Sequence, residues 1–345
     1  MTGNKITATF EVVTPLFLGG ADPASTVELR PPSIKGALRF WWRALAWSRH
    51  RGDLDAIKKE EQKIFGTAGD DRDRLGQASF GLRARWRAEP NRLAETGPRS
   101  LTSGKPGASY LSYGIINRGQ GNSPRSCYQL GGCFELTFQA LRHTDNESGF
   151  HPSLLDAIKL FGLLGGLGGR SRRGWGSVAL TQLGGEGAAL QWQAPQNLDE
   201  YRDALFSILG STADTPEAVY SAFSKGARLN VFGIGVDALT VLDQLGQAYQ
   251  AFRREPANRG FIFGLPHSRF KGDADRRASP LLFHVHNLNG QFAIAVLFLR
   301  APFLEQQPCW KEYEKIDRLL NQLPTSLKTK GLTQAFGVLP GGPSA

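Results

Sequence analysis

The most informative stretch of the chain is residues 28–43, which read Glu28-Leu29-Arg30-Pro31-Pro32-Ser33-Ile34-Lys35-Gly36-Ala37-Leu38-Arg39-Phe40-Trp41-Trp42-Arg43. Apolar residues recur in it at helical spacing, since Ile34, Leu38 and Trp41 are four and three positions apart. Two prolines stop extended structure just before this run, and Ser33 is a suitable N-cap. The pattern therefore predicts a helix over residues 34–50 that packs one face against a sheet.

Strands are predicted on either side of this helix. Residues 5–13 alternate between apolar and polar side chains, as a half-buried strand does. The same alternation or β-rich composition predicts further strands at residues 80–87, 134–141 and 177–181. Helical spacing predicts a second helix at residues 153–164. The order strand, helix, strand, strand, helix, strand is that of the ferredoxin-like or RRM-like α+β fold. An N-terminal domain of this class is expected over residues 1–183.

The second half of the chain predicts another α+β domain, more divergent, over residues 184–345. Its pattern indicates helices at residues 198–209, 216–224, 238–252 and 310–323, and strands at 281–288 and 292–299. The length of 345 residues agrees with two domains. Between these elements, residues 66–126 are rich in Gly, Arg, Ser and Pro and are predicted to be mostly loop.

Composition narrows the class of protein. Hydrophobic residues make up 41% of the chain and charged residues 21%, which is typical of a folded globular protein. The apolar runs are too short to span a bilayer and the N-terminus has no signal-peptide pattern, so a cytoplasmic protein without membrane contact is expected. Cys127, Cys133 and Cys309 form no close pair, which predicts reduced thiols rather than disulfides or a zinc site.

Positive charge is concentrated in the first half. Residues 1–180 contain 25 Lys and Arg against 16 Asp and Glu, whereas residues 181–345 contain 16 against 15. A surplus confined to one domain indicates a polyanion site, because each neutralised phosphate releases counterions. A basic surface that serves only solubility is the alternative.

Within that half, three cations lie on one face of the predicted helix. Lys35, Arg39 and Arg43 are spaced by four residues, so they repel one another unless anions compensate them. Phosphate is the candidate anion, and the free amides near Gly36 in the first turn would add to its attraction. Trp41 is predicted to face the sheet and Trp42 to be rotated away from it. A solvated basic face is the alternative interpretation.

A second basic motif follows the second helix. Residues 162–176 hold seven glycines, three arginines and a tryptophan. Glycines let a backbone approach a ligand, arginines pair bidentately with phosphate, and Trp175 could stack on a base. The motif lacks the Lys of a P-loop, so nucleotide hydrolysis of that type is not indicated. We therefore expect this loop to contact RNA.

These motifs resemble a known family. Residues 14–20 and 28–43 are similar to the N-terminal signature of the first subunit of type III-B (Cmr) CRISPR effector complexes, which belongs to the RAMP superfamily. The loop at residues 162–176 is similar to the glycine-rich loop of that superfamily. The segment Arg276-Arg277-Ala278-Ser279-Pro280-Leu281 resembles a motif of the same subunit's second domain.

The resemblance implies two ferredoxin-like domains and a non-catalytic subunit at the 3′ end of the guide RNA. Its expected partners are the guide (CRISPR) RNA, complementary target RNA and other RAMP subunits, namely a small one beside it and the backbone subunit, in antiviral defence. The expected RNA contacts are Arg30, Ser33, Lys35, Gly36, Arg39, Trp42, Arg43, Gly168, Gly169, Arg170, Arg172, Arg173, Trp175, Arg276 and Arg277. The last two could instead pair with Asp273 and Asp275.

Catalytic groups are not expected, and neither is a cofactor. His284 and His286 share a face of a predicted strand, but no third metal ligand is evident, so a place in the core or on the surface is favoured. The segment Asp70-Asp71-Arg72-Asp73 could hold a metal, but its interleaved arginines favour a solvated cluster. Two alternatives remain: a RAMP-family endonuclease that processes guide or cleaves target RNA, and a basic scaffold that binds no RNA.

Overall fold

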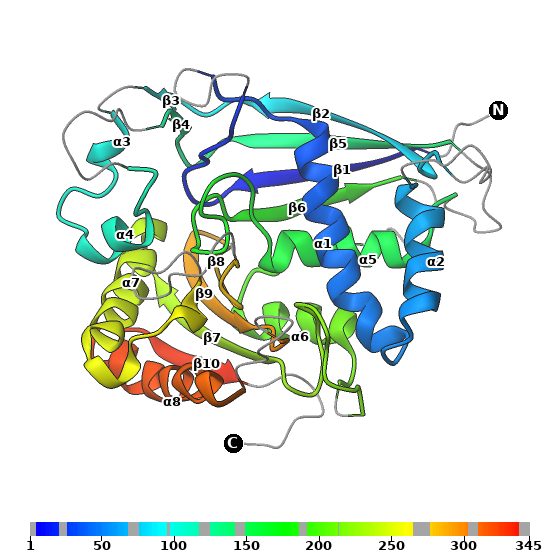
Figure 1. Cartoon of the computed structure of the whole chain (residues 1–345). Helices are drawn as coiled ribbons and strands as arrows, with labels where there is room; N and C mark the ends of the chain where they lie inside the picture. The colour runs from blue at the N-terminus through cyan, green and yellow to red at the C-terminus, as the bar shows by residue number, and fades with distance from the viewer. Residues whose placement is uncertain are drawn as a thin grey trace.

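The first domain is built on a four-stranded antiparallel sheet. The computed structural model describes residues 5–20, 26–67, 76–94, 97–116, 125–141, 149–185, 192–212, 214–264, 277–302 and 310–337. The strands are β1 (Lys5–Val12), β2 (Phe80–Ala88), β5 (Cys133–Ala140) and β6 (Val178–Gly184), and they pair in the order β2-β5-β1-β6. Helices α1 (Pro31–Arg49) and α5 (Pro152–Leu164) follow the first and third strands and cover one face of the sheet (Figure 1). This is the ferredoxin-like arrangement that the sequence predicts.

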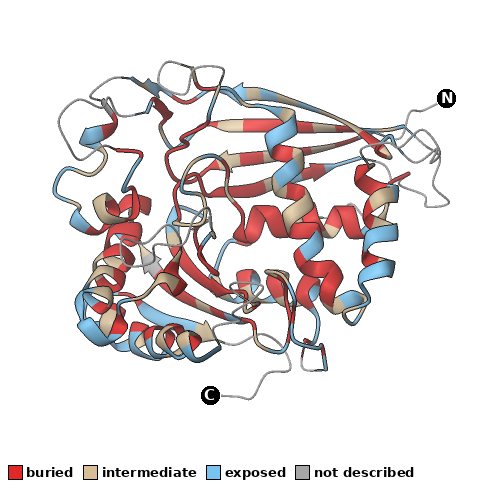
Figure 2. Cartoon of the chain, in the orientation of Figure 1, coloured by how far each residue is buried: buried red, intermediate tan, exposed pale blue. Residues whose placement is uncertain are grey.

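Alternation along β1 explains which face is covered. Ile6, Ala8, Phe10 and Val12 are buried beneath the helices, whereas the residues between them are partly exposed. The ring of Phe10 stacks on Phe134 of β5 with a centroid distance of 5.4 Å. Figure 2 shows α5 buried along nearly all of its length, since it lies between the first sheet and the second domain.

Helix α1 begins three residues earlier than predicted. Pro31 and Pro32 occupy the first turn, where a missing N–H costs nothing, and Arg30 is the N-cap, so Ser33 lies inside the helix. Helix α2 (Leu54–Phe65) is an addition to the elements that the sequence predicts. Asp53 caps it by accepting hydrogen bonds from the backbone N–H groups of Asp55 and Ala56.

The second sheet repeats the topology of the first. Strands β7 (Arg228–Gly235), β8 (Leu281–Leu288), β9 (Gln291–Phe298) and β10 (Thr333–Gly337) pair antiparallel in the order β10-β7-β9-β8. Helices α7 (Ala238–Arg254) and α8 (Glu314–Lys328) supply the two crossovers. The α+β class with two ferredoxin-like domains is therefore confirmed.

Of the two helices that the sequence predicts between the two sheets, the structure contains one. Helix α6 (Leu198–Leu209) has the predicted bounds, but no helix forms over residues 216–224, which are bends and irregular chain. The Tyr201 hydroxyl of α6 donates to the Leu163 carbonyl at 2.6 Å, so this helix packs against the first domain. The division of the chain at residue 183 stays a prediction.

Shorter elements complete the fold. They are β3 (Arg92–Leu93), α3 (Gly97–Ser100), α4 (Pro106–Leu111), β4 (Cys127–Tyr128) and the 3-10 turns Pro256–Asn258, Phe261–Phe263 and Trp310–Tyr313. Helix α4 lies against α7, because Gly107 lets the two backbones meet and its N–H donates to the Asp243 carboxylate at 2.7 Å. In the described ranges, none of the helices is long and apolar enough to cross a membrane.

The loop after α5 joins the two domains. The Phe283 N–H of β8 donates to the Arg172 carbonyl at 3.1 Å, and the Val285 N–H donates to the Ser177 hydroxyl at 3.1 Å. The Thr14 hydroxyl donates to the Gly174 carbonyl at 2.7 Å from the first domain. The glycine-rich loop (residues 165–176) is thus hydrogen-bonded on both sides and is not a free linker.

Candidate nucleic-acid interface

Two of the three cations on α1 are balanced within the protein. Glu61 of α2 is buried and accepts from Arg43 through both carboxylate oxygens at 2.7 Å, while Arg39 Nε lies 2.7 Å from Glu61 Oε1. The hydrogen bond to Glu61 raises the pKa of Arg43. The compensating anion that the spacing requires is therefore supplied, for these two residues, by a neighbouring helix.

The first turn of α1 remains open. Arg30, Ser33 and Gly36 are exposed, and a Cβ added at Gly36 would meet no atom within 4 Å. The Lys35 ammonium lies 5.5 Å from the centre of the Phe80 ring. Burial, with a smaller contribution from the charge of Arg39, lowers the pKa of Lys35. The ion pairs of α1 within the described part of the chain are made by its later arginines, so an anion at the first turn would meet cations. The free amides that the sequence suggested there are absent, because Pro31 and Pro32 have no N–H and the Ser33 and Ile34 N–H groups donate to the Arg30 carbonyl.

The two tryptophans among the expected RNA contacts are in the core, which corrects both assignments. Trp42 is 1% exposed and its indole N–H donates to the Ser153 hydroxyl at 2.8 Å. Trp175 is fully buried and packs edge-on against Phe17 at 5.5 Å. Neither ring can stack on a base, because helix α1 carries Trp42 on the side that faces α5 and the loop turns Trp175 inward.

The glycines of the loop serve internal packing. Gly168 has a φ of +76°, and a Cβ there would lie 2.4 Å from the Phe17 carbonyl oxygen. The Gly169 N–H donates to that same oxygen at 2.8 Å, and its Cβ would lie 2.6 Å from Ile115. The close approach that the glycines permit is therefore to the protein's own backbone, and not to a ligand as the sequence suggested.

The loop arginines are held by neutral acceptors. Arg172 donates to the Ser279 carbonyl at 2.9 Å and lies over the Phe40 ring, and burial with the charges of Arg277 and Arg173 lowers its pKa to about 10. Arg173 donates to the Tyr249 hydroxyl and the Phe263 carbonyl, each at 2.8 Å. Arg170 is exposed, with its guanidinium beside Gly114. Of the three, Arg170 presents its charge most openly to solvent.

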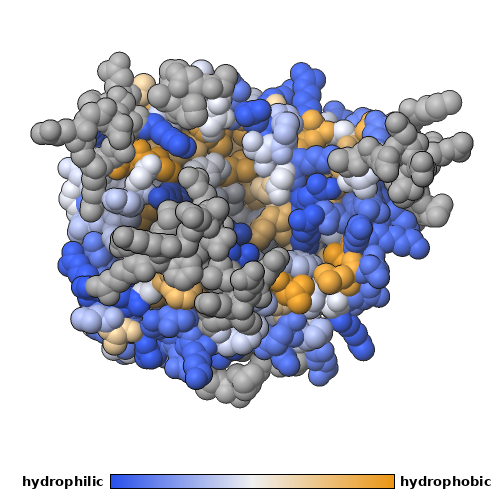
Figure 3. Space-filling view, in the orientation of Figure 1, coloured by the Kyte–Doolittle hydropathy of each residue, from blue (hydrophilic) through white to orange (hydrophobic). Residues whose placement is uncertain are grey.

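The loop and α1 together form a groove, which we call the α1 groove. Its volume is about 610 Å³, and it is lined by the exposed face of α1, by α2 and by the loop. The structure brings together in it five of the expected contacts from three segments: Gly36, Arg39, Arg43, Arg172 and Arg277. A smaller cavity beside it joins Arg30 and Ser33 to Gly168 and Ser171. Figure 3 shows this side of the molecule, where apolar side chains at the centre are flanked by hydrophilic ones.

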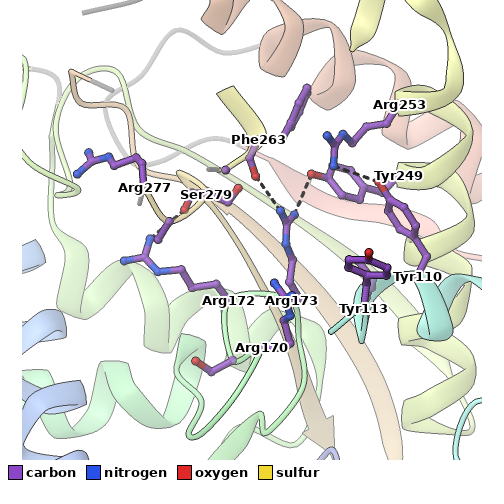
Figure 4. A pocket seen from close by; sticks show the side chains of 14 residues that line it. Tyr110, Tyr113, Arg170, Arg172, Arg173, Tyr249, Arg253, Phe263, Arg277 and Ser279 are labelled. Carbon is purple, nitrogen blue, oxygen red and sulfur yellow. Dashed lines mark hydrogen bonds between the residues drawn. The ribbon is translucent and has the colours of Figure 1, made fainter. Parts of the chain in front are cut away.

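A second cavity of about 580 Å³, the arginine pocket, lies on the other side of the loop (Figure 4). Arg170, Arg172 and Arg173 form one wall, and Arg277 and Ser279 lie at its edge. The opposite wall contains residues that no sequence pattern singled out: Tyr110, Tyr113, Tyr249, Arg253 and Phe263. Tyr249 and Arg253 are four apart on α7, a pairing visible in the sequence, but nothing local showed that α7 meets the loop.

Some of the other candidate residues lie outside the described residues or in the core. Arg276, Cys309 and Asp70 to Asp73 lie outside the described residues. His284 and His286 are buried, and burial lowers the pKa of His284 to about 3. His284 Nδ1 lies 2.9 Å from the Gly165 carbonyl, and His286 stacks on Tyr201 at 4.3 Å. Across the described ranges, no group of three His, Cys, Asp or Glu could hold a metal.

Comparison with known proteins agrees with this architecture. The model of the RAMP superfamily matches residues 9–179. The Cmr1-1 subunit of the Pyrococcus furiosus Cmr CRISPR system is 29% identical over 295 residues, which cover 80% of this chain and 82% of that protein.

Solved structures show the same fold along nearly the whole chain. The crystal structure of Pyrococcus furiosus Cmr1 in its apo form superposes with a TM-score of 0.65 at 23% identity, covering 98% of this chain and 99% of that one. A chain in the cryo-EM structure of type III-B Cmr-beta bound to cognate target RNA superposes with a TM-score of 0.58 at 13% identity, covering 94% and 99%. Residues 9–179 thus match the RAMP superfamily, and the chain as a whole is similar to the first subunit of a Cmr CRISPR system.

Proposed function

We propose that this chain is a non-catalytic RNA-binding subunit of a type III-B CRISPR effector in the cytoplasm. It would lie at the 3′ end of the guide RNA, beside a small RAMP subunit and the backbone subunit, and would contact guide and target RNA. The position at the 3′ end rests on the family resemblance. The contact with RNA rests on the site itself.

The observation that carries the proposal is the convergence of basic groups on the α1 groove. Helix α1 brings Arg39 and Arg43 to this groove, the loop brings Arg172 from more than a hundred residues away, and Arg30 lines the smaller cavity beside it. The dipole of α1 adds positive potential at its N-terminus. Sites of this kind bind phosphate without reading sequence, as a subunit that accepts many different guides must.

The test is RNA affinity of the assembled complex as a function of salt. We expect Arg30→Gln with Lys35→Gln to weaken guide RNA binding and to flatten the log K against log salt line by about 0.7 per lost contact. Arg202→Gln is the matched control, because Arg202 is paired with Asp199 and Asp203 on α6. An unchanged slope in the double variant would remove the first turn of α1 from the RNA path.

A separate experiment, with the isolated chain and Mg²⁺, addresses catalysis. We expect labelled guide and target RNA to stay intact in the presence of this chain alone. Cleavage that is lost in an Asp71→Asn variant would establish the endonuclease alternative instead.

A further inference from the structure

The arginine pocket is built from both domains. The loop of the first domain supplies Arg170 and Arg173, and the second domain supplies Arg253 of α7 and Phe263. Tyr113, from the segment after α4, is 62% exposed at its mouth. A ligand in this pocket would therefore touch the two domains at once (Figure 4).

Among the described residues, no carboxylate pairs with Arg170, Arg172, Arg173 or Arg253 in the way that Glu61 pairs with the arginines of α1. None of the described residues that line the pocket is acidic. The hydrogen-bond acceptors of Arg172, Arg173 and Arg253 are carbonyl and phenol oxygens, including the Tyr110 hydroxyl at 3.1 Å from Arg253. The Nε atom of Arg253 is buried and has no acceptor among the described residues.

Crowding of like charges in the arginine pocket disfavours the charged forms of its arginines. Although Arg170 is exposed to solvent on one side, its partial desolvation and the charges of Arg173 and Arg125 lower its pKa. Burial and the charges of Arg277 and Arg173 lower the pKa of Arg172 in the same way. The charged forms are thus disfavoured by their surroundings. A phosphate group would supply opposite charge and several acceptor oxygens in one step.

We propose that the arginine pocket is a second anion site, which shares Arg172 and Arg277 with the α1 groove, and that a phosphate bound there clamps the two domains together. The inference rests on the proposed function, since the natural occupant would be a phosphate of the bound RNA with an adjoining base on the exposed Tyr113 ring. Without the anion, repulsion among the arginines opposes the contact between the loop and the second domain.

Two amides report on this contact directly. The N–H groups of Phe283 and Val285 in β8 donate to Arg172 O and Ser177 Oγ, so they exchange with solvent only when the loop separates from β8. A clamp predicts slower exchange of these two amides when the pocket is occupied. Exchange in the far strand β10 should change little.

The experiment measures thermal unfolding and amide exchange of the full chain with inorganic pyrophosphate, and with adenosine 3′,5′-bisphosphate to add a base. We expect each anion to raise Tm by about 3 °C or more and to slow exchange at Phe283 and Val285. Arg170→Gln should raise Tm in the absence of anion and lose most of the anion-induced rise. Arg253→Gln should also lose that rise.

Arg51→Gln is the matched control. Arg51 is an exposed arginine with a positive φ of 49°, close to the 63° of Arg170, but lies at the end of α1 outside the pocket. Its Tm should rise with pyrophosphate as in the unmodified chain. Equal anion-induced rises in all variants, or unchanged exchange at Phe283 and Val285, would overturn the clamp. RNA binding without any pyrophosphate effect would refute only the clamp, whereas a pyrophosphate effect without RNA binding would refute only the proposed function.

Discussion

The α1 cluster (Lys35, Arg39, Arg43) and the loop cluster (Arg170, Arg172, Arg173) look alike in the sequence but differ in how their charge is balanced. On α1, Glu61 binds two of the three cations. In the loop, the hydrogen-bond partners of Arg172 and Arg173 are neutral oxygens. Spacing along one helix therefore shows that anions are needed, but only the fold shows whether the protein already supplies them.

The largest effects should come from the tryptophan beside each cluster. Trp42→Ala and Trp175→Ala should each lower the free energy of unfolding by about 3–5 kcal/mol, because both rings are buried and leave cavities. Replacement by Phe should destabilise the chain to a different extent at the two positions. Trp42→Phe should cost about 1 kcal/mol for the lost bond to Ser153, whereas Trp175→Phe should cost less, because the Trp175 indole N–H is buried with no acceptor in the described part of the chain.

Denaturant unfolding of the four variants checks this prediction. Trp41 is 3% exposed, so Trp41→Ala should rank with Trp42→Ala and not above it. A large stability loss in Trp175→Phe would mean that its N–H has a partner and that the loop packs differently.

The next effect concerns the loop backbone. Gly168→Val should destabilise the chain by about 2–4 kcal/mol, since it forces a branched side chain into a left-handed conformation and against the Phe17 carbonyl. Gly36→Ala is the control on α1, where a Cβ meets nothing and a helix gains from alanine. Thermal melts should move in opposite directions. Gly168→Val that loses RNA affinity at unchanged stability would restore the idea that this glycine admits a ligand.

The order of strands and helices in the first domain follows from the sequence because each element carries a clear period. Residues 5–13 alternate and residues 34–50 repeat every three to four positions, so both are predictable with small errors at the ends. Helix α2 escapes prediction, although it has a capping residue and apolar positions at Ile57 and Ile64, because it lies beside a glycine- and charge-rich segment. The stretch at 216–224 has helix formers but is held by tertiary contacts such as the bond from Phe223 N–H to the Ala44 carbonyl.

The site could be predicted only in part for a different reason. Composition and charge identified the segments that form it, because arginines and glycines are concentrated there. The partners of those arginines come from segments far away in the sequence: Glu61 lies 18 residues from Arg43, and Tyr249 lies 76 residues from Arg173. No period or motif encodes such pairs, and a buried Trp175 looks the same in a sequence as an exposed one.

A smaller effect on stability should come from protonation of His284 and His286, which lie beside the start of the loop. Gly165 O is an acceptor, so His284 Nδ1 carries the hydrogen, and His286 Nδ1 must then donate to His284 Nε2 at 3.2 Å. Burial lowers the pKa of both rings, that of His284 to about 3, whereas the unfolded rings titrate near 6.5. Protons therefore bind the unfolded chain first, and stability is lost as pH falls below about 6.5 toward the folded pKa.

The expected loss is about 1.4 kcal/mol per pH unit for each histidine that stays neutral in the folded state. Chemical unfolding at pH 7, 6 and 5 measures it. His286→Phe keeps a ring on Tyr201 and should reduce this pH dependence. A variant with the same slope against pH as the unmodified chain would show that the two histidines are not its source.

Replacing Glu61, the carboxylate that pairs with the α1 cluster, should lower the stability of the fold modestly and strengthen RNA binding. Glu61→Gln should cost about 1 kcal/mol, because the arginines that it binds are partly exposed and screened by solvent. The same change frees Arg39 and Arg43, so the complex should bind RNA more tightly and with a steeper salt dependence. Glu60→Gln on the same helix is the control, since Glu60 binds His50 and Ser153 instead. Unchanged RNA affinity in Glu61→Gln would mean that RNA does not pass along α1.

The smallest expected effect is a difference between two arginines of the loop cluster, Arg170 and Arg173. Arg173 uses its two terminal nitrogens on Tyr249 and Phe263, whereas the Arg170 side chain is exposed and has no hydrogen bond in the described ranges. Arg170→Gln should therefore flatten the salt dependence of RNA binding by about 0.7 while leaving the fold intact.

Arg173→Gln should lower Tm, because two hydrogen bonds to the second domain are lost, and should change the salt slope less. Arg173→Lys keeps the charge but cannot reach both acceptors, so its Tm should fall as well. If Arg173 variants flatten the salt line as much as Arg170→Gln at unchanged Tm, then Arg173 leaves its acceptors to bind phosphate, and the two clusters differ less than their geometry indicates.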